Sequence, residues 1–126
     1  MTAKTSSTNT MHIGELAERT GLSLRTIRHY DEVGLLPATS RTGGGFRVYT
    51  EDDFERLMVI KQMKPLGFSL EEMADILGIL ATPDSAVSEG SGTLAKFLDK
   101  AVHQRAKMVR NLAQADEFIQ RLRGRT

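Results

Sequence analysis

The arginines of this 126-residue chain are the residues whose type and spacing point to a chemistry, and that chemistry is binding to a polyanion. Five arginines lie within Arg19–Arg47, and the segment Lys96–Arg125 has eight basic residues against three acidic ones. The segment Glu51–Asp75 has the opposite balance, with seven acidic and three basic residues. A locally basic surface can bind a polyanion even though the net charge is only +1. The same charges would also be found on ordinary solvated helix faces. The choice between these two interpretations therefore depends on the helices and strands that position the arginines.

Residues suited to catalysis or metal binding are missing or badly spaced. The chain has no cysteine, which excludes disulfides, thiolate metal sites and iron–sulfur clusters. Its histidines, His12, His29 and His103, are far apart and lack metal-ligand spacing. His29 and Asp31 are two residues apart, so on a helix they point in different directions. Gly43–Gly45 lacks the lysine and the following helix of a phosphate-binding loop. The sequence therefore predicts a protein that is not an enzyme and has no cofactor or metal.

Two short predicted helices carry the first arginines. In "HIGELAERTG", Ile13 and Leu16 share one helical face, and Gly21 follows as a stop. In "SLRTIRHYDEVG", Ser23 can cap a second helix, which Gly34 closes. Two short helices separated by "TGLS" predict a helix-turn-helix.

The next segment, "LLPATSRTGGGFRVYT", predicts a short β-hairpin with a flexible tip at Arg41–Gly45. Thr50 then begins a helix, with Asp53 placed as in a capping box. Its predicted buried side consists of Phe54, Leu57, Met58 and Met63. Pro65 should end or kink this helix.

A stronger capping box, Ser69 with Glu72, begins another helix. We predict that the polar residues 1–10 form a disordered tail, that residues 11–80 form one domain, and that residues 81–93 form a linker. No stretch approaches the roughly 20 apolar residues that span a bilayer, and the N-terminus has no apolar core of a secretory signal. We therefore expect a cytoplasmic protein that does not associate with membranes.

A final helix, residues 94–123, carries an apolar seam at alternating spacings of four and three. The seam residues are Leu94, Leu98, Ala101, Met108, Leu112, Ala115, Ile119 and Leu122. A helix of about 30 residues is roughly 45 Å long, and the shorter preceding helices cannot cover such a seam. A second copy can, which predicts a homodimer. Arg105 interrupts the seam: its side chain either reaches solvent or pairs with Asp99 or Glu89 of the other subunit.

Three separate motifs carry a family resemblance in order and at matching spacing. They are "IGELAERTGLSLRTIRHYDEVGLLP", "RTGGGFRVY" and "LGFSLEEMADIL". The sequence resembles the MerR family of bacterial transcription regulators from about Ile13 to Leu80, and in architecture as far as Arg123. The resemblance implies a mostly α fold, in which a winged helix-turn-helix DNA-binding domain with a small β-hairpin wing precedes a long antiparallel coiled-coil dimerisation helix. It also implies a homodimer that binds a palindromic promoter operator in double-stranded DNA, distorts it, and acts on RNA polymerase.

The resemblance makes residues 24–33 the recognition helix that enters the major groove. Arg25 is the best candidate for reading base edges, while Arg28 and Tyr30 match backbone contacts. Lys61 and Lys64 match a basic stretch near a second wing at residues 68–70. The full set of implied DNA-binding positions is Arg25, Thr26, Arg28, His29, Tyr30, Arg41, Phe46, Arg47, Tyr49, Lys61 and Lys64.

Several of these positions have alternative interpretations. Arg28 can instead pair with Glu32, four residues on. Tyr30 and Tyr49 can instead belong to the core, and the wing arginines match positions that either bind phosphate or anchor the wing. Of these two roles, we expect Arg47 to contact phosphate, so that its loss would lower the salt dependence of DNA binding by about one unit of slope. Phe46 stands where many relatives carry a tyrosine, so a hydroxyl contact to phosphate is lost there.

The resemblance leaves the effector and one competing function open. The family's effector site generally lies at or beyond the far end of the coiled-coil helix, and this sequence ends in "RGRT" directly after it. We therefore expect no C-terminal effector domain and no cysteine-based metal or redox sensing. No small effector, an effector at the dimer interface, and control by a protein partner all remain possible. The competing function is a coiled-coil adaptor, which would not need Arg25 or Arg47.

Overall fold

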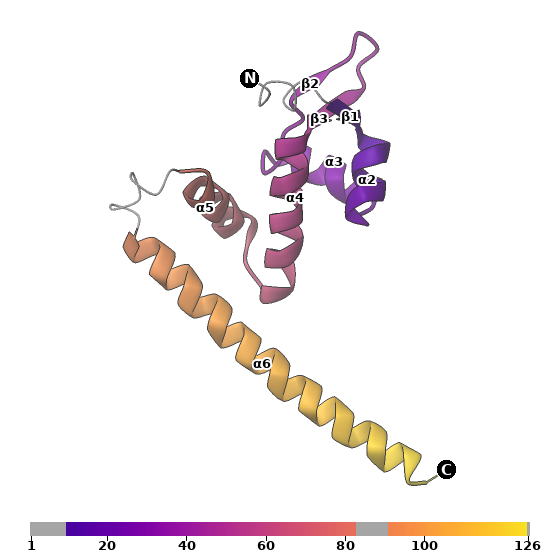
Figure 1. Ribbon diagram of the computed structural model, residues 1–126, viewed down its shortest axis with the longest axis vertical. Helices are drawn as coiled ribbons and strands as arrows, with labels where there is room; N and C mark the ends of the chain where they lie inside the picture. Colours follow the sequence, from indigo (N-terminus) through magenta and orange to yellow (C-terminus); the bar gives the residue numbers. More distant parts are fainter. Residues whose placement is uncertain (1–9, 83–90, 126) are drawn as a thin grey trace. The chain divides into compact units, whose positions relative to one another are not determined.

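A computed structural model describes residues 10–82 and 91–125 of the chain (Figure 1). It divides into two compact units, which meet in the sequence between Leu77 and Gly78. Most of the predicted tail (1–10) and most of the predicted linker (81–93) lie outside the described residues. The domain boundaries proposed from the sequence therefore remain predictions.

The first unit contains the predicted helix-turn-helix. Helix α2 spans Ile13–Thr20 and helix α3 spans Leu24–Glu32. Between them Gly21 adopts a left-handed conformation, φ 77°, and its N–H donates to the Ala17 carbonyl at 2.8 Å. The Ser23 hydroxyl accepts from the Thr26 N–H at 3.1 Å, which caps α3 as the sequence predicted.

The predicted hairpin is present, but it belongs to a three-stranded antiparallel sheet. Strands β1 (Thr10–His12), β2 (Ser40–Arg41) and β3 (Arg47–Thr50) lie in the order β1-β3-β2. The sequence analysis missed β1, because it assigned Thr10 to the tail and three residues are too few to show an alternating pattern. Met11 pairs with Tyr49 in register, so the central strand holds both edge strands.

Helix α4 (Glu51–Met63) follows β3 directly, and helix α5 (Leu70–Ala81) comes next among the α-helices. Both predicted capping boxes are present, at Thr50 with Asp53 and at Ser69 with Glu72. Pro65 lies in a 3₁₀ turn, η1 (Lys64–Leu66), which ends α4 where the proline predicted.

The core of this unit forms where α2, α3, α4 and the sheet meet. Leu16, Ile27, Tyr49, Leu57 and Ile60 are completely buried. Of the predicted buried side of α4, Leu57 and Met63 are buried and Phe54 and Met58 are half-buried, whereas the fully buried Ile60 was missed. Tight packing between the two short helices and the sheet fixes the orientation of α3.

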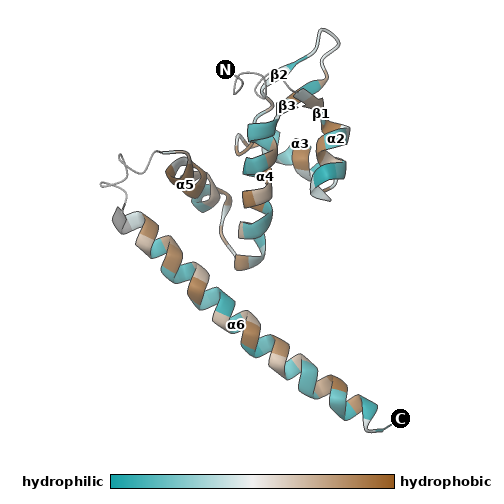
Figure 2. Cartoon of the chain, viewed as in Figure 1, coloured by the Kyte–Doolittle hydropathy of each residue, from teal (hydrophilic) through white to brown (hydrophobic). Residues whose placement is uncertain are grey.

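The second unit is dominated by helix α6 (Ser91–Arg123), which confirms the predicted long C-terminal helix. Apolar residues recur along its whole length, as the brown segments of Figure 2 show. None of the helices in the described ranges is apolar enough over a sufficient length to cross a membrane. Together with the winged helix-turn-helix of the first unit, α6 gives the mostly helical fold that the sequence predicted.

Candidate nucleic-acid interface

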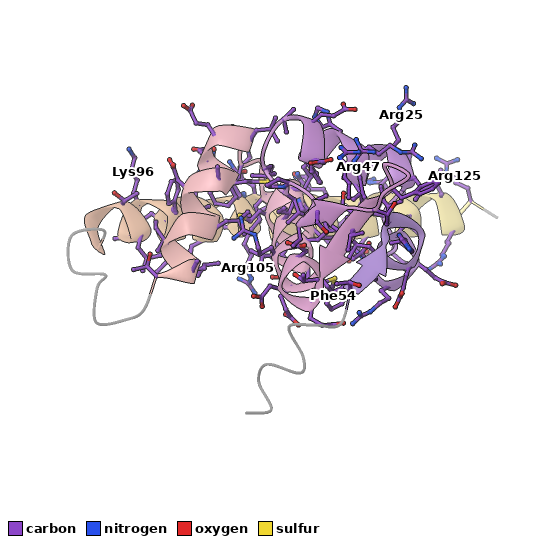
Figure 3. The ribbon with its side chains drawn as sticks, turned by 90° about the horizontal axis from the view of Figure 1, so that it is seen from above. Arg25, Arg47, Phe54, Lys96, Arg105 and Arg125 are labelled. Carbon is purple, nitrogen blue, oxygen red and sulfur yellow. The ribbon has the colours of Figure 1, made fainter. Side chains whose placement is uncertain are left out.

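Five of the eleven residues predicted to bind DNA line one shallow surface pocket of about 410 Å³. They are Arg25, Thr26, His29, Tyr30 and Lys64, with Leu70 completing the lining. The Arg25 side chain points away from the domain (Figure 3). Within residues 10–82 and 91–125, no hydrogen bond or ion pair is recorded for its guanidinium, so its donors face outward.

The opposite side of α3 belongs to the core. Ile27 is completely buried and Tyr30 is only 5% exposed. Burial raises the pKa of the Tyr30 phenol above its ordinary value. The core interpretation of Tyr30 is therefore the one that the structure supports. Arg28 is exposed on α3, and among the described residues no ion pair joins it to Glu32.

One carboxylate, that of Asp31 near the end of α3, ties the hairpin to this helix. Its Oδ2 accepts from Arg47 Nε at 2.5 Å and from Arg41 Nη2 at 3.3 Å. Its Oδ1 accepts from the Ala38 N–H at 3.1 Å. Arg41 also donates through Nη1 to the Gly45 carbonyl at 3.2 Å. Helix, hairpin and connecting loop thus converge on a single side chain.

The electrostatics of this cluster favour its charged form. Burial alone would raise the pKa of the Asp31 carboxyl, but hydrogen bonds from Arg47 and Ala38 and the charges of both arginines bring it below its usual value. The hydrogen bond to Asp31 raises the pKa of Arg47 in turn. The lowered pKa therefore favours the ionised form of Asp31.

Asp31 was not among the site residues predicted from the sequence, where its spacing from His29 only argued against a catalytic pair. The residues that it joins lie 10 and 16 positions further along the chain. No helical or strand spacing rule connects positions so far apart. The available signal was an acidic residue in an arginine-rich segment, just before a hairpin with two arginines.

The remaining wing residues differ in exposure. Phe46 is 68% exposed and lies just before β3. Tyr49 is completely buried, and its hydroxyl has no hydrogen-bond partner among the described residues. Burial raises the pKa of the Tyr49 phenol to about 12. The structure therefore supports the packing interpretation of Tyr49.

Besides Arg41 and Arg47, two other basic residues of the first unit have partners within the protein. Lys61 Nζ donates to the Thr20 carbonyl at 2.6 Å, where a cation complements the C-terminus of α2. Arg19 pairs with both oxygens of Glu51, at 2.6 and 3.2 Å, and its guanidinium carbon lies 4.0 Å from the centre of the Phe54 ring. Both residues are exposed, but counting basic residues overestimated the number whose charge has no partner within the protein.

The predicted seam of α6 is largely exposed to solvent in this single chain. Leu98, Leu112 and Leu122 are 60%, 62% and 53% exposed. Leu94, Met108, Ala115 and Ile119 are exposed as well, whereas Ala101 is half-buried. Arg105 is exposed, and Glu89, one of its suggested partners, lies outside the described residues.

In the part that the structure describes, no three or more histidine, aspartate or glutamate side chains gather where they could hold a metal ion.

Comparisons with known proteins agree with this geometry. The family model described as "MerR HTH family regulatory protein" matches residues 11–78, and the model "MerR, DNA binding" matches residues 54–124. The HTH-type transcriptional regulator YfmP of Bacillus subtilis is 55% identical over 64 residues, which cover 50% of this chain and 46% of that protein. A ZntR homologue of Haemophilus influenzae is 33% identical over 116 residues, which cover 92% of this chain and 83% of the relative.

Among solved structures, a similar one is HiNmlR, a MerR family regulator lacking the sensor domain, bound to promoter DNA. It is 26% identical with a TM-score of 0.67, and the match covers 89% of each chain. The match to this chain spans about half the length of the first curated relatives, 46% of one and 52% of another.

Proposed function

Because the chain belongs to the MerR family of helix-turn-helix regulatory proteins, we propose that it is a transcription regulator that binds double-stranded promoter DNA in a sequence-specific manner. One observation carries the proposal: the outward-facing polar side chains of α3 lie on the same helix to which Asp31 fastens the wing. A reading element and a backbone-binding element thus have a fixed relative geometry, as a bound duplex requires.

The exposed face of α3 suits the major groove. A guanidinium can bridge the two acceptors of guanine, so Arg25 is the proposed base-reading residue. Thr26 and His29 beside it can donate to or accept from neighbouring base edges or phosphates. Lys64, across the pocket, offers a mobile positive charge to the backbone.

The exposed seam of α6 supports a homodimer, with two antiparallel copies burying the apolar residues against each other. A dimer would present two copies of α3 to a palindromic operator. Distorting such an operator costs on the order of 1–6 kcal/mol for a smooth bend. Phosphate contacts from both wings would offset this cost.

The family and the domain architecture also support a proposal about where the protein acts and with which partner. We propose that the protein acts at promoters together with RNA polymerase, in the cytoplasm, and that it catalyses no reaction. The similarity to HiNmlR, a MerR family regulator lacking the sensor domain that is bound to promoter DNA, supports promoter-DNA binding by the part of the fold that the two chains share.

The proposal is tested by fluorescence anisotropy with labelled DNA from upstream of the protein's own gene, and with a scrambled duplex of equal length as the control. We expect tight, salt-dependent binding to the upstream DNA and weaker binding to the scrambled duplex. A protein that dimerises but binds both duplexes equally weakly would instead be the coiled-coil adaptor.

A further inference from the structure

We infer that Asp31 is the residue that positions the wing, and that it divides the two wing arginines into an anchor, Arg47, and a phosphate ligand, Arg41. This inference rests on the proposed function, because it assigns separate roles to residues of the proposed DNA-binding surface. It also assigns Arg47 the anchoring role, in place of the phosphate contact that we expected from the sequence.

Arg47 has the geometry of an anchor. Its Nε lies 2.5 Å from Asp31 Oδ2, and the two side chains are only 18% and 12% exposed. Arg47 belongs to β3, the central strand, two residues before the completely buried Tyr49. Turning Arg47 toward DNA would leave the Asp31 carboxylate without its shortest partner in a partly buried site, which is unfavourable. Arg47 is therefore retained by Asp31 when DNA binds.

Arg41 has the geometry of a residue that can leave Asp31 and bind a DNA phosphate. Its side chain is 50% exposed, and its contact with Asp31 is 3.3 Å long. It belongs to the edge strand β2 and also donates to Gly45 at the hairpin tip. A long ion pair that is half in water contributes little, so Arg41 can exchange it for a phosphate without loosening the wing. The planar guanidinium then offers two parallel donors to the phosphate oxygens.

The charges of the cluster support the same division. Two guanidinium groups share one carboxylate, so the cluster carries a surplus positive charge. Asp31 is satisfied by Arg47 and by the Ala38 N–H. Release of Arg41 therefore leaves both carboxylate oxygens with a hydrogen-bond donor.

The test compares the salt dependence of operator binding in Arg41→Ala, Arg47→Ala and Asp31→Asn, measured by anisotropy. Loss of a phosphate contact should lower the slope of log K against log salt by about one unit, and we expect this only for Arg41→Ala. Arg47→Ala and Asp31→Asn should weaken binding roughly tenfold with an unchanged slope. A variant that merely damages the fold would weaken binding without lowering the slope, so a lower slope in Arg41→Ala alone identifies a lost phosphate contact. If Arg47→Ala does not fold, Arg47→Gln, whose amide can still donate to Asp31, tests the slope alone: it removes the charge and should leave the slope unchanged.

Hydrogen exchange without DNA tests the anchor independently. Backbone amides of residues 40–50 should exchange faster in Asp31→Asn than in the wild type. Glu32→Gln removes the same charge from the next, exposed position of α3 and should leave exchange unchanged. A wild type that binds no operator would refute the proposed function, while the exchange result would still decide the anchor. The inference is overturned if Arg47→Ala lowers the slope, if Arg41→Ala does not, or if Asp31→Asn leaves exchange unchanged.

Discussion

A single substitution in α6, Leu112→Glu, should dissociate the proposed homodimer. Leu112 lies in the middle of the apolar seam and is 62% exposed in the isolated chain. In the proposed dimer this surface is buried against a second copy of α6. A carboxylate at that position would have to lose its hydration to enter the interface, or keep the two helices apart.

The size of the effect follows from the exposed area. Burying a whole leucine side chain contributes about 1.5–3 kcal/mol. Since 62% of Leu112 is still exposed, dimerisation can gain about 1–2 kcal/mol from each copy, or about 2–4 kcal/mol per dimer. Losing this gain raises the dissociation constant roughly 30- to 700-fold. The buried charge adds to the loss, so these figures are a lower bound.

Sedimentation equilibrium at micromolar concentration provides the assay. The wild type should sediment at twice the chain mass and Leu112→Glu at the chain mass. Gln114→Glu is the matched control: it adds a carboxylate two residues away, which at about 100° per residue lies on the far side of the helix. The reasoning is refuted if the wild type is monomeric, or if Gln114→Glu dissociates the dimer as strongly as Leu112→Glu.

Three further predictions concern the first unit. Arg25→Ala should cost about 1–3 kcal/mol on the operator and little on random DNA; equal losses in a competition assay would show that Arg25 reads no base. Tyr49→Phe removes a buried hydroxyl that has no partner among the described residues, so the free energy of unfolding in urea should stay constant or rise by about 1 kcal/mol; a clear decrease would contradict this. The pKa of Asp31 lies below its ordinary value of 3.8 in the folded state, so its stabilising contribution is complete above that pH and is lost as the pH falls through the lowered pKa. Urea unfolding of Asp31→Asn should therefore depend less on pH than that of the wild type in this acidic range, and identical profiles would rule out the contribution.

Local signals made most of the fold predictable from the sequence. Gly21, Ser23, the two capping boxes and Pro65 act within one turn of their own position, so their effects can be read from spacing alone. The seam of α6 was predictable for the same reason, because a helix repeats its faces at a fixed period. Strand β1 gave no such signal, since its only evidence is its pairing with β3, almost 40 residues later in the chain.

The candidate site was less predictable, because its roles depend on contacts between distant residues. The sequence grouped Arg25, His29 and Lys64 among the expected DNA-binding residues, and in the fold these three residues line one pocket. It could not show that Lys61 donates to the end of α2, since residue 20 lies 41 positions earlier. Residue type reveals which side chains can bind phosphate, but only tertiary contacts reveal which of them are already engaged.

The way in which α3 divides its residues has a consequence for how such a regulator can diverge. Ile27 and Tyr30 are buried in the core and Asp31 binds Arg47 of the wing, whereas Arg25 and His29 face outward from the same helix. Substitutions at exposed positions outside such contacts usually change stability by no more than about 0.5 kcal/mol. After a gene duplication, substitutions at these two outward-facing residues could let one copy recognise a new operator, while the other copy kept its specificity for the old one. Both copies would have to retain Asp31, so the positions most free to drift are those that define the target.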